Sequence, residues 1–247
     1  MMNEELQKII KDLRLWGMLE HWDEYLKLAE KQHFSAVRLL THVIKEEYKV
    51  KQGRAKVYRM QRAHIPEPFV MATFPFNRQR KLNKKKLLAI YDSFDYVNKC
   101  QNVIWVGPTG CGKTGLATSF LTHAIEEGCS GLYISFPELV SKLYASMADH
   151  TQEKVIKKYA SCDCLLIDEV GYVEVEPAQV GLFFELMHKR HKTKTTLVTS
   201  NLGFSEWGSF LKNNHLTAAL IDRLTENSHV INMRNCVSLR PKLGQEK

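Results

Sequence analysis

Residues 105–115 read WVGPTGCGKTG, and this stretch decides the fold. Residues 107–114 within it match the pattern GxxxxGK(S/T) at every position. Glycines let such a loop turn tightly and aim backbone N–H groups at phosphate oxygens, while the lysine reaches the β- and γ-phosphates and the hydroxyl reaches Mg²⁺. The glycine spacing differs from that of a dinucleotide-binding fingerprint. We therefore predict a phosphate-binding loop that uses Gly107, Pro108, Thr109, Gly110, Cys111, Gly112, Lys113 and Thr114.

Short apolar runs surround this loop and predict strands. They occupy residues 103–106, 132–136, 164–168, 196–200 and 229–233. Helix-forming segments separate them: one near residues 87–97, one after the loop, and two opened by Pro137 and Pro177. Apolar runs that alternate with helices are typical of a parallel sheet covered on both faces. We expect an α/β fold with a five-stranded parallel sheet and helices on both sides.

The first 62 residues predict helices only. Apolar residues recur at helical spacing from residue 6, Gly17 is a plausible break, and Ser35 can cap a third helix that continues into a basic stretch. Prolines at 66, 68 and 75 then resist helix formation. We predict a small all-helical N-terminal domain (1–64), a connector (65–86) and a nucleotide-binding domain (87–247) with a minimal C-terminal lid.

Composition excludes several classes of protein. The chain has 247 residues, 44% of them hydrophobic and 25% charged, which is ordinary for a globular protein. It contains no uninterrupted apolar run of the roughly 18 residues that a membrane span requires, and the first residues mix acids and bases, unlike a signal peptide. Six cysteines form no CxxC pair. We expect a cytoplasmic protein with reduced, mostly buried thiols and no membrane contact.

Positive charge is clustered in three acid-free runs. The net charge is +8, and the runs cover residues 49–62, 78–86 and 189–194. Such clusters favour a polyanionic partner, usually nucleic acid. Aromatic residues are not interleaved through the runs, so contact with a duplex backbone fits better than base stacking on a single strand. The candidate DNA-binding residues are Arg54, Arg59, Arg62, Lys84, Lys85, Lys189, Arg190 and Lys192.

Polar residues at the ends of two apolar runs predict the chemistry. The run LLIDE places Asp168 where it can hold Mg²⁺ together with Thr114, and Glu169 where it can orient a water for attack on a γ-phosphate. A kinase that transfers phosphate to a substrate hydroxyl has little use for that second carboxylate. In TSN, the amide of Asn201 could bond the attacking water or the γ-phosphate.

Two arginines can supply positive charge to a nucleotide. Arg223, in LIDRLTE, could enter the site of a neighbouring subunit as an arginine finger. Arg240, in CVSLRP, could sense the phosphates of its own subunit.

Five motifs follow one another over about 140 residues: GPTGCGKT, LLIDE, TSN, DRL and SLR. Their order resembles that of the AAA+ ATPases of the DnaC/IstB branch, and of the IstB-like transposition helpers in particular. The N-terminal pattern that runs from Glu47 through Lys51 and Arg54, then RxxxxIPE and a Phe-rich connector, is also typical of these helpers. The resemblance implies an AAA+ core and an ATPase that binds ATP and Mg²⁺.

The resemblance also implies partners and residue roles. Such helpers assemble on duplex DNA with little sequence preference when ATP is bound, as a ring or spiral homo-oligomer, for example a decamer. They present the DNA to a partner transposase of the IstA kind. By the same resemblance Lys113 and Thr114 are the Walker A ligands and Asp168 and Glu169 the Walker B pair. The sensors and the finger are Asn201 (sensor 1), Arg223 (finger) and Arg240 (sensor 2).

Three features depart from the pattern, and alternatives stay open. Cys236 stands where sensor 2 motifs carry glycine, Gly115 replaces a larger residue, and no separate helical lid follows the last strand.

A DnaC-like replicative helicase loader shares the same ATPase and would prefer single-stranded DNA. A small-metabolite kinase would need an arginine-bearing lid over a substrate pocket, which the sequence does not show. A DNA-binding module with a vestigial ATP site is the remaining reading.

Overall fold

The computed structural model describes residues 2–240, and the chain divides into two compact units between Tyr58 and Arg59. The first unit contains α1 (Glu4–Asp12), α2 (Trp16–Lys31) and most of α3 (Ala36–Arg62). Side chains cap two of these helices: Asn3 Oδ1 accepts the Leu6 N–H at 2.7 Å, and Ser35 Oγ accepts the Arg38 N–H at 3.3 Å. The cap at Ser35 and the extension of α3 into the basic stretch confirm two predictions.

The predicted helix break at Gly17 is wrong, because Gly17 lies inside α2. The chain turns earlier, between α1 and α2, and Gly17 is needed where α2 approaches α3. A Cβ on Gly17 would lie 2.9 Å from Glu47 Oε2 and 3.0 Å from Val50 Cγ2. The same carboxylate accepts the Met18 N–H at 2.8 Å. Glu47 therefore caps α2, which has no cap from its own flanking residue.

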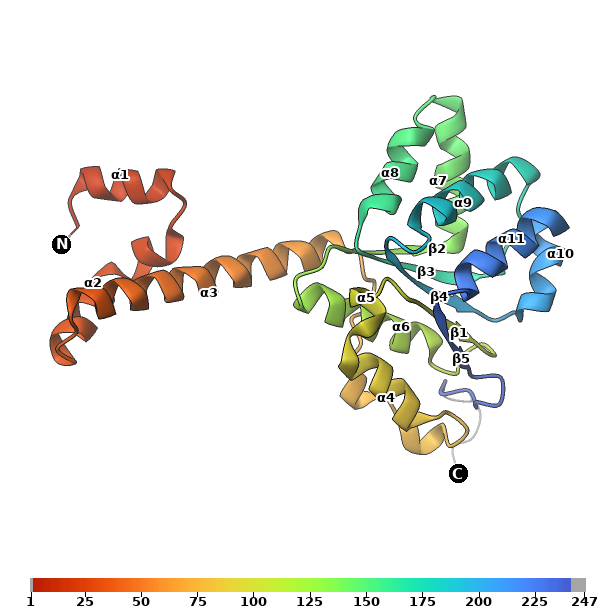
Figure 1. Ribbon diagram of the computed structural model, residues 1–247, viewed down its shortest axis with the longest axis horizontal. Helices are drawn as coiled ribbons and strands as arrows, with labels where there is room; N and C mark the ends of the chain where they lie inside the picture. Colours follow the sequence, from red (N-terminus) through yellow and green to blue (C-terminus); the bar gives the residue numbers. More distant parts are fainter. Residues whose placement is uncertain (1, 241–247) are drawn as a thin grey trace. The chain divides into compact units, whose positions relative to one another are not determined.

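The second unit is built on a five-stranded parallel sheet of order β2-β3-β4-β1-β5 (Figure 1). The strands are β1 (Asn102–Val106), β2 (Gly131–Ser135), β3 (Cys164–Val170), β4 (Thr195–Ser200) and β5 (Ser228–Asn232). All five predicted strands are confirmed, most within a residue or two. The phosphate-binding loop leaves β1 between β4 and β5, and β3 lies on the other side of β4. The carboxyl ends of β1, β3 and β4 therefore share one edge of the sheet.

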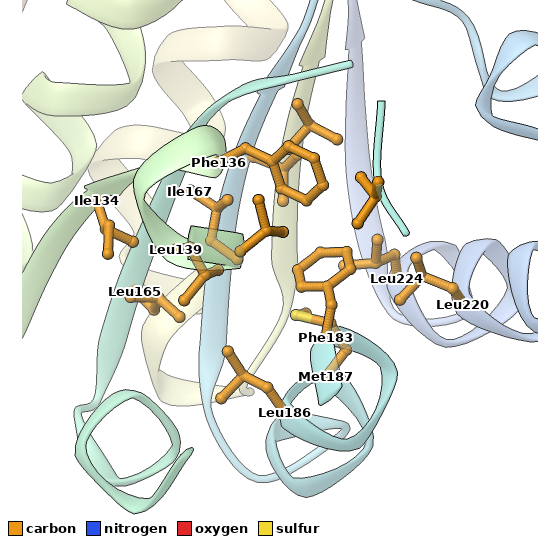
Figure 2. Packing of buried hydrophobic residues seen from close by; sticks show 14 of the residues in the cluster. Ile134, Phe136, Leu139, Leu165, Ile167, Phe183, Leu186, Met187, Leu220 and Leu224 are labelled. Carbon is orange, nitrogen blue, oxygen red and sulfur yellow. The ribbon is translucent and has the colours of Figure 1, made fainter. Parts of the chain in front are cut away.

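Helices cover both faces of this sheet, as predicted. On one face lie α7 (Phe136–Ala148), α8 (Gln152–Ser161), α9 (Pro177–Arg190), α10 (Trp207–Leu211) and α11 (Asn214–Thr225). In Figure 2, Phe136 and Phe183 pack over Leu165 and Ile167 of β3, with Leu224 beside them. The alternate strand residues, such as Leu166, point to the opposite face. Burial on both faces explains the continuous apolar runs in the sequence.

The opposite face carries α4 (Lys84–Ser93), α5 (Asp95–Asn98) and α6 (Lys113–Glu126), together with the 3-10 turns η1 (Met71–Thr73) and η2 (Phe76–Arg78). A third such turn, η3 (Phe204–Glu206), precedes α10. The single helix predicted near residues 87–97 is instead two, because Phe94 adopts a left-handed conformation (φ 57°) between α4 and α5. Within residues 2–240, no helix is long and apolar enough to cross a membrane.

Candidate nucleotide-binding site

The phosphate-binding loop (residues 107–114) has the conformation that its glycines allow. Gly110 and Gly112 adopt positive φ angles of 79° and 98°. A Cβ on Gly112 would lie 2.7 Å from the Phe74 ring, so both φ and space require glycine there. Gly112 is also the N-cap of α6 and offers no capping side chain, which leaves the first N–H groups of that helix for an anion.

Lys113 lies in this loop as a buried cation. Its Nζ donates to the carbonyl oxygens of Gly107 at 2.7 Å and Pro108 at 2.9 Å. Burial lowers the pKa of the ammonium group, since it lacks full hydration. A pocket of about 540 Å³ opens beside it, lined also by Thr114, Glu169 and Arg240. Backbone donors, a helix N-terminus and a lysine around one cavity fit the phosphates of a nucleotide.

Three hydroxyl groups hold the carboxylate of Asp168, which is 2% exposed. Thr114 Oγ1 donates from 3.0 Å, Tyr133 donates to Oδ2 from 3.0 Å, and the Thr199 hydroxyl donates to Oδ1. Tyr133 belongs to β2 and Thr199 to β4, the two strands that flank β3. A carboxylate beside a threonine hydroxyl is a suitable oxygen donor set for Mg²⁺. Thr114 and Asp168 are thus brought together as predicted.

Sequence reasoning missed Tyr133 and Thr199. Both lie inside runs whose pattern predicts only strands, LYISF and TLVTS. The available signal was a polar residue near the carboxyl end of a buried strand that neighbours LLIDE. Burial and the nearby Asp168 carboxylate raise the pKa of Tyr133, so its hydroxyl stays protonated and remains a donor.

Glu169 differs from Asp168 in exposure and backbone. It is exposed, it lines the pocket, and it adopts a left-handed φ of 63°, which is unusual for a residue with a side chain. Its backbone N–H donates to Thr199 Oγ1 at 3.0 Å. Thr199 therefore contacts both members of the acidic pair. The conformation turns the Glu169 side chain out of the sheet.

Asn201 follows β4 directly and is half-buried. Its Oδ1 is buried, and among the described residues no group donates to it. A Cβ on Gly171 would lie 3.4 Å from this oxygen, which places the amide beside the turn that follows β3. An unused buried acceptor at the end of β4 suits a water or ligand partner. The role predicted for Asn201 stays a prediction.

Arg240 lies at the pocket because the C-terminal segment returns to the phosphate-binding loop. The Leu239 N–H donates to the Gly110 carbonyl at 2.8 Å, and Arg240 lines the pocket. Cys236 is buried and its N–H bonds the Met233 carbonyl at 2.9 Å. Its φ is not positive, so a cysteine in place of glycine is accommodated here without backbone strain.

Comparison with known proteins agrees with this geometry. Residues 8–245 match the family described as IstB-like ATP binding protein. The chain belongs to that family. It is 26% identical over 230 residues to an ATP-binding protein of insertion sequence IS21 from Pseudomonas aeruginosa, covering 93% of this chain and 86% of that protein. It is 27% identical to its counterpart in IS5376 from Geobacillus stearothermophilus, covering 100% and 98%.

Solved structures show the same fold. A structure of DnaI has a TM-score of 0.57 at 19% identity and covers 67% of this chain and 90% of that chain. The DnaC helicase loader has a TM-score of 0.53 at 19% identity, covering 61% and 87%. AMPPCP-bound DnaA from Aquifex aeolicus has a TM-score of 0.55 at 16% identity, covering 67% and 50%. The second unit therefore has the AAA+ fold, and as an IstB-like family member the chain binds ATP.

The connector completes the pocket of this IstB-like protein, and sequence reasoning missed its part. Glu67 lines the pocket. Phe69 packs on the first turn of α6, where a Cβ on Gly115 would lie 3.3 Å from its ring. The unusual glycine at position 115 is thus matched by a phenylalanine that lies against it.

Arg223 does not line the pocket of its own subunit among the residues described. It lies on α11 with its guanidinium 4.7 Å from the centre of the Phe184 ring. Its Nη1 donates to the Ala219 carbonyl at 2.9 Å, and its Nε lies 3.4 Å from His188 Nδ1. The side chain is half-exposed on the helical face formed by α9 and α11. Its action on a neighbouring subunit stays a prediction.

Most of the predicted DNA-binding residues are exposed, but their surroundings differ. Lys84 and Lys85 are exposed at the start of α4. Lys189 is paired with Glu185, and Lys192 with Glu226. Arg54, which lies 5.7 Å from the Trp16 ring, and Arg62 are exposed on α3, and Arg59 is half-buried. Lys84 and Lys85 are therefore better placed for phosphate contacts than the lysines that carboxylates already engage.

The prediction that Arg190 binds DNA is wrong. It is 1% exposed, so it is not available to DNA. Its guanidinium donates to the carbonyl oxygens of Tyr159 and Cys162 at 2.8 Å, to Thr196 Oγ1 at 3.0 Å, and to the Thr195 carbonyl. Arg190 ties α8, α9 and β4 together. A basic run in the sequence does not reveal that one member points inward.

Proposed function

We propose that this chain is an ATPase that assembles on duplex DNA when ATP is bound and recruits and stimulates a partner transposase. The observation that carries the proposal is the acidic pair at the end of β3. Asp168 is buried and held by hydroxyls next to Thr114, whereas Glu169 is exposed and lines the same pocket as Lys113. In this proposal Asp168 would bind a metal and Glu169 would act on water.

The chain's own residues would perform hydrolysis as follows. The phosphate oxygens of ATP would accept hydrogen bonds from the backbone N–H groups of the loop. They would also attract the Lys113 ammonium group, which would leave the two carbonyl oxygens that it now contacts. Mg²⁺, held by Thr114 and Asp168, would neutralise charge on the phosphates. Glu169 would orient the water that attacks the γ-phosphate. Arg240, which lines the pocket beside Gly110, would add positive charge to the phosphates.

Assembly would depend on Arg223. Arg223 lies on α11 and outside its own pocket. If it contacts a nucleotide, that nucleotide would belong to a neighbouring subunit in a ring or spiral. ATP would then join subunits, and hydrolysis would release them. Successive subunits would align their exposed lysines along DNA, so that many weak phosphate contacts add up.

The transposition role is supported by the relatives, which are ATP-binding proteins of insertion sequences. A cytoplasmic location fits such a partner. The second candidate is a replicative helicase loader, and the likeness to DnaI and the DnaC helicase loader favours it. The two differ in the nucleic acid: the helper should prefer duplex DNA and the loader a single strand.

Light scattering with Mg·ATP and a duplex of about 60 base pairs, compared with a single strand and with ADP, tests assembly. We expect a large complex only with ATP and duplex. E169Q should keep the complex on DNA because hydrolysis stops after ATP binds, while K113A should not assemble. Assembly of both variants without nucleotide would contradict the mechanism. Preference for the single strand would select the helicase loader.

A further inference from the structure

Gln79 is a buried amide that links two distant segments of the chain. It follows η2 in the connector and is 1% exposed. Its Nε2 donates to the Cys111 carbonyl at 2.9 Å and to the Val237 carbonyl at 2.7 Å. Its Oε1 accepts the Val237 N–H at 3.0 Å. Both N–H groups and the carbonyl oxygen of the amide are therefore used, one toward the phosphate-binding loop and two toward the C-terminal segment.

These bonds fix the position of the segment that carries Arg240. Val237 is held by Gln79, and two residues later the Leu239 N–H donates to the Gly110 carbonyl. Between these two points, Ser238 Oγ accepts the Arg240 N–H at 3.3 Å. β5 ends at Asn232, and the next residue still bonds the sheet, because the Met233 N–H donates to the Val106 carbonyl of β1 at 2.7 Å. Further along the segment, Gln79 supplies an anchor at Val237.

We propose that Gln79 is a positioning residue for nucleotide discrimination: it holds the C-terminal segment on the phosphate-binding loop so that Arg240 faces the terminal phosphate of ATP. The inference rests on the proposed function only for the role of Arg240, and it needs neither DNA, nor assembly, nor hydrolysis. ATP carries one more phosphate than ADP, so a correctly placed arginine favours ATP by charge-assisted hydrogen bonds.

A purely structural role for Gln79 would give a different result. If Gln79 only stabilised the loop, its loss would weaken ATP and ADP equally, because both nucleotides use the same backbone N–H groups. If it acts through Arg240, its loss should reduce the preference for ATP over ADP. In a protein that lacks Arg240, replacing Gln79 should not change the ATP-over-ADP preference any further.

The experiment measures dissociation constants of Mg·ATP and Mg·ADP by calorimetry on wild type, Q79L, R240A and the double variant, without DNA. We expect Q79L and R240A each to lower the ATP-over-ADP preference about tenfold, the value of one lost charge-assisted bond. The double variant should show no further decrease beyond R240A. Q61L, at an exposed glutamine of α3, is the control and should match wild type.

Any of three results would overturn the proposal: an unchanged preference in Q79L, an equal loss of ATP and ADP affinity, or additive effects in the double variant. Thermal unfolding identifies variants that do not fold. If Q79L is among them, Q79E replaces it, because glutamate keeps the shape but turns a carboxylate oxygen toward the Cys111 and Val237 carbonyls. The binding constants can still be measured if the protein does not hydrolyse ATP or bind DNA. Either failure would therefore contradict the proposed function but not the role of Gln79.

Discussion

At the scale of single residues, the hydroxyl groups around Asp168 decide how well it can bind a metal. Y133F removes one of the three donors and keeps the ring, while T199V removes another. We expect the Mg²⁺ concentration at half-maximal ATP hydrolysis to rise about tenfold or more in each variant, since groups that orient metal ligands have effects of that size. Nucleotide binding in EDTA should not change.

T199S keeps a hydroxyl and should restore the Mg²⁺ dependence. Tyr144, which is 53% exposed, supplies the tyrosine control Y144F. If Y133F and Y144F require the same Mg²⁺ concentration, Tyr133 does not position Asp168.

Arg190 is a buried charged residue whose loss should destabilise the fold. R190A would remove the guanidinium donor from the carbonyl oxygens of Tyr159, Cys162 and Thr195 and open a cavity. We expect the free energy of unfolding to fall by about 3 kcal/mol or more, measured by urea titration. K189A, at the exposed neighbour, should change it by less than about 0.5 kcal/mol. Equal effects of the two variants would contradict the structural role of Arg190.

At the scale of elements, alanine substitutions at two glycines of the N-terminal helices should have opposite effects on stability. A Cβ on Gly53 in α3 has no atom within 4 Å, whereas one on Gly17 in α2 would press on Glu47 and Val50. G53A should stabilise its helix by roughly 0.5–1 kcal/mol through propensity alone. G17A should separate α2 from α3 and destabilise both. Hydrogen exchange of the α2 and α3 amides measures each effect, and protection that rises in both variants would contradict the close contact at Gly17.

The elements also show why some features could be predicted and others could not. The central strands were predictable because a parallel strand that is buried on both faces is a largely apolar run, such as VIWV in β1. The edge strands β2 and β5 are only partly buried, but they still carry short apolar runs between helices. The residues of the phosphate-binding loop were predictable because phosphate binding fixes their identity and spacing. The roles of Phe94, Gly17 and Gln79 could not be predicted, since they depend on what lies against these residues in three dimensions. Local sequence carries no signal for such contacts.

At the scale of the whole molecule, the distribution of charge predicts which lysines meet DNA. Lys84 and Lys85 are exposed at the start of α4, and no carboxylate within ion-pair distance of them is found in residues 2–240. Lys189 and Lys192 are also exposed, but they pair with Glu185 and Glu226. A DNA phosphate must compete with those carboxylates for Lys189 and Lys192. Contacts made by these two lysines should therefore release fewer counterions from the DNA than contacts made by Lys84 and Lys85.

The measurement is the duplex affinity of the ATP-bound E169Q protein as a function of salt. In the E169Q background, K84A/K85A should reduce the slope of log affinity against log salt by about 0.9 per lysine and per subunit in contact. K189A/K192A, which removes the same charge, should reduce it by clearly less. Because both variants remove two positive charges from the same E169Q background, a general effect of charge would change both slopes equally. A larger decrease in K84A/K85A than in K189A/K192A would therefore place the DNA on the α4 side of the sheet, next to the connector that lines the nucleotide pocket.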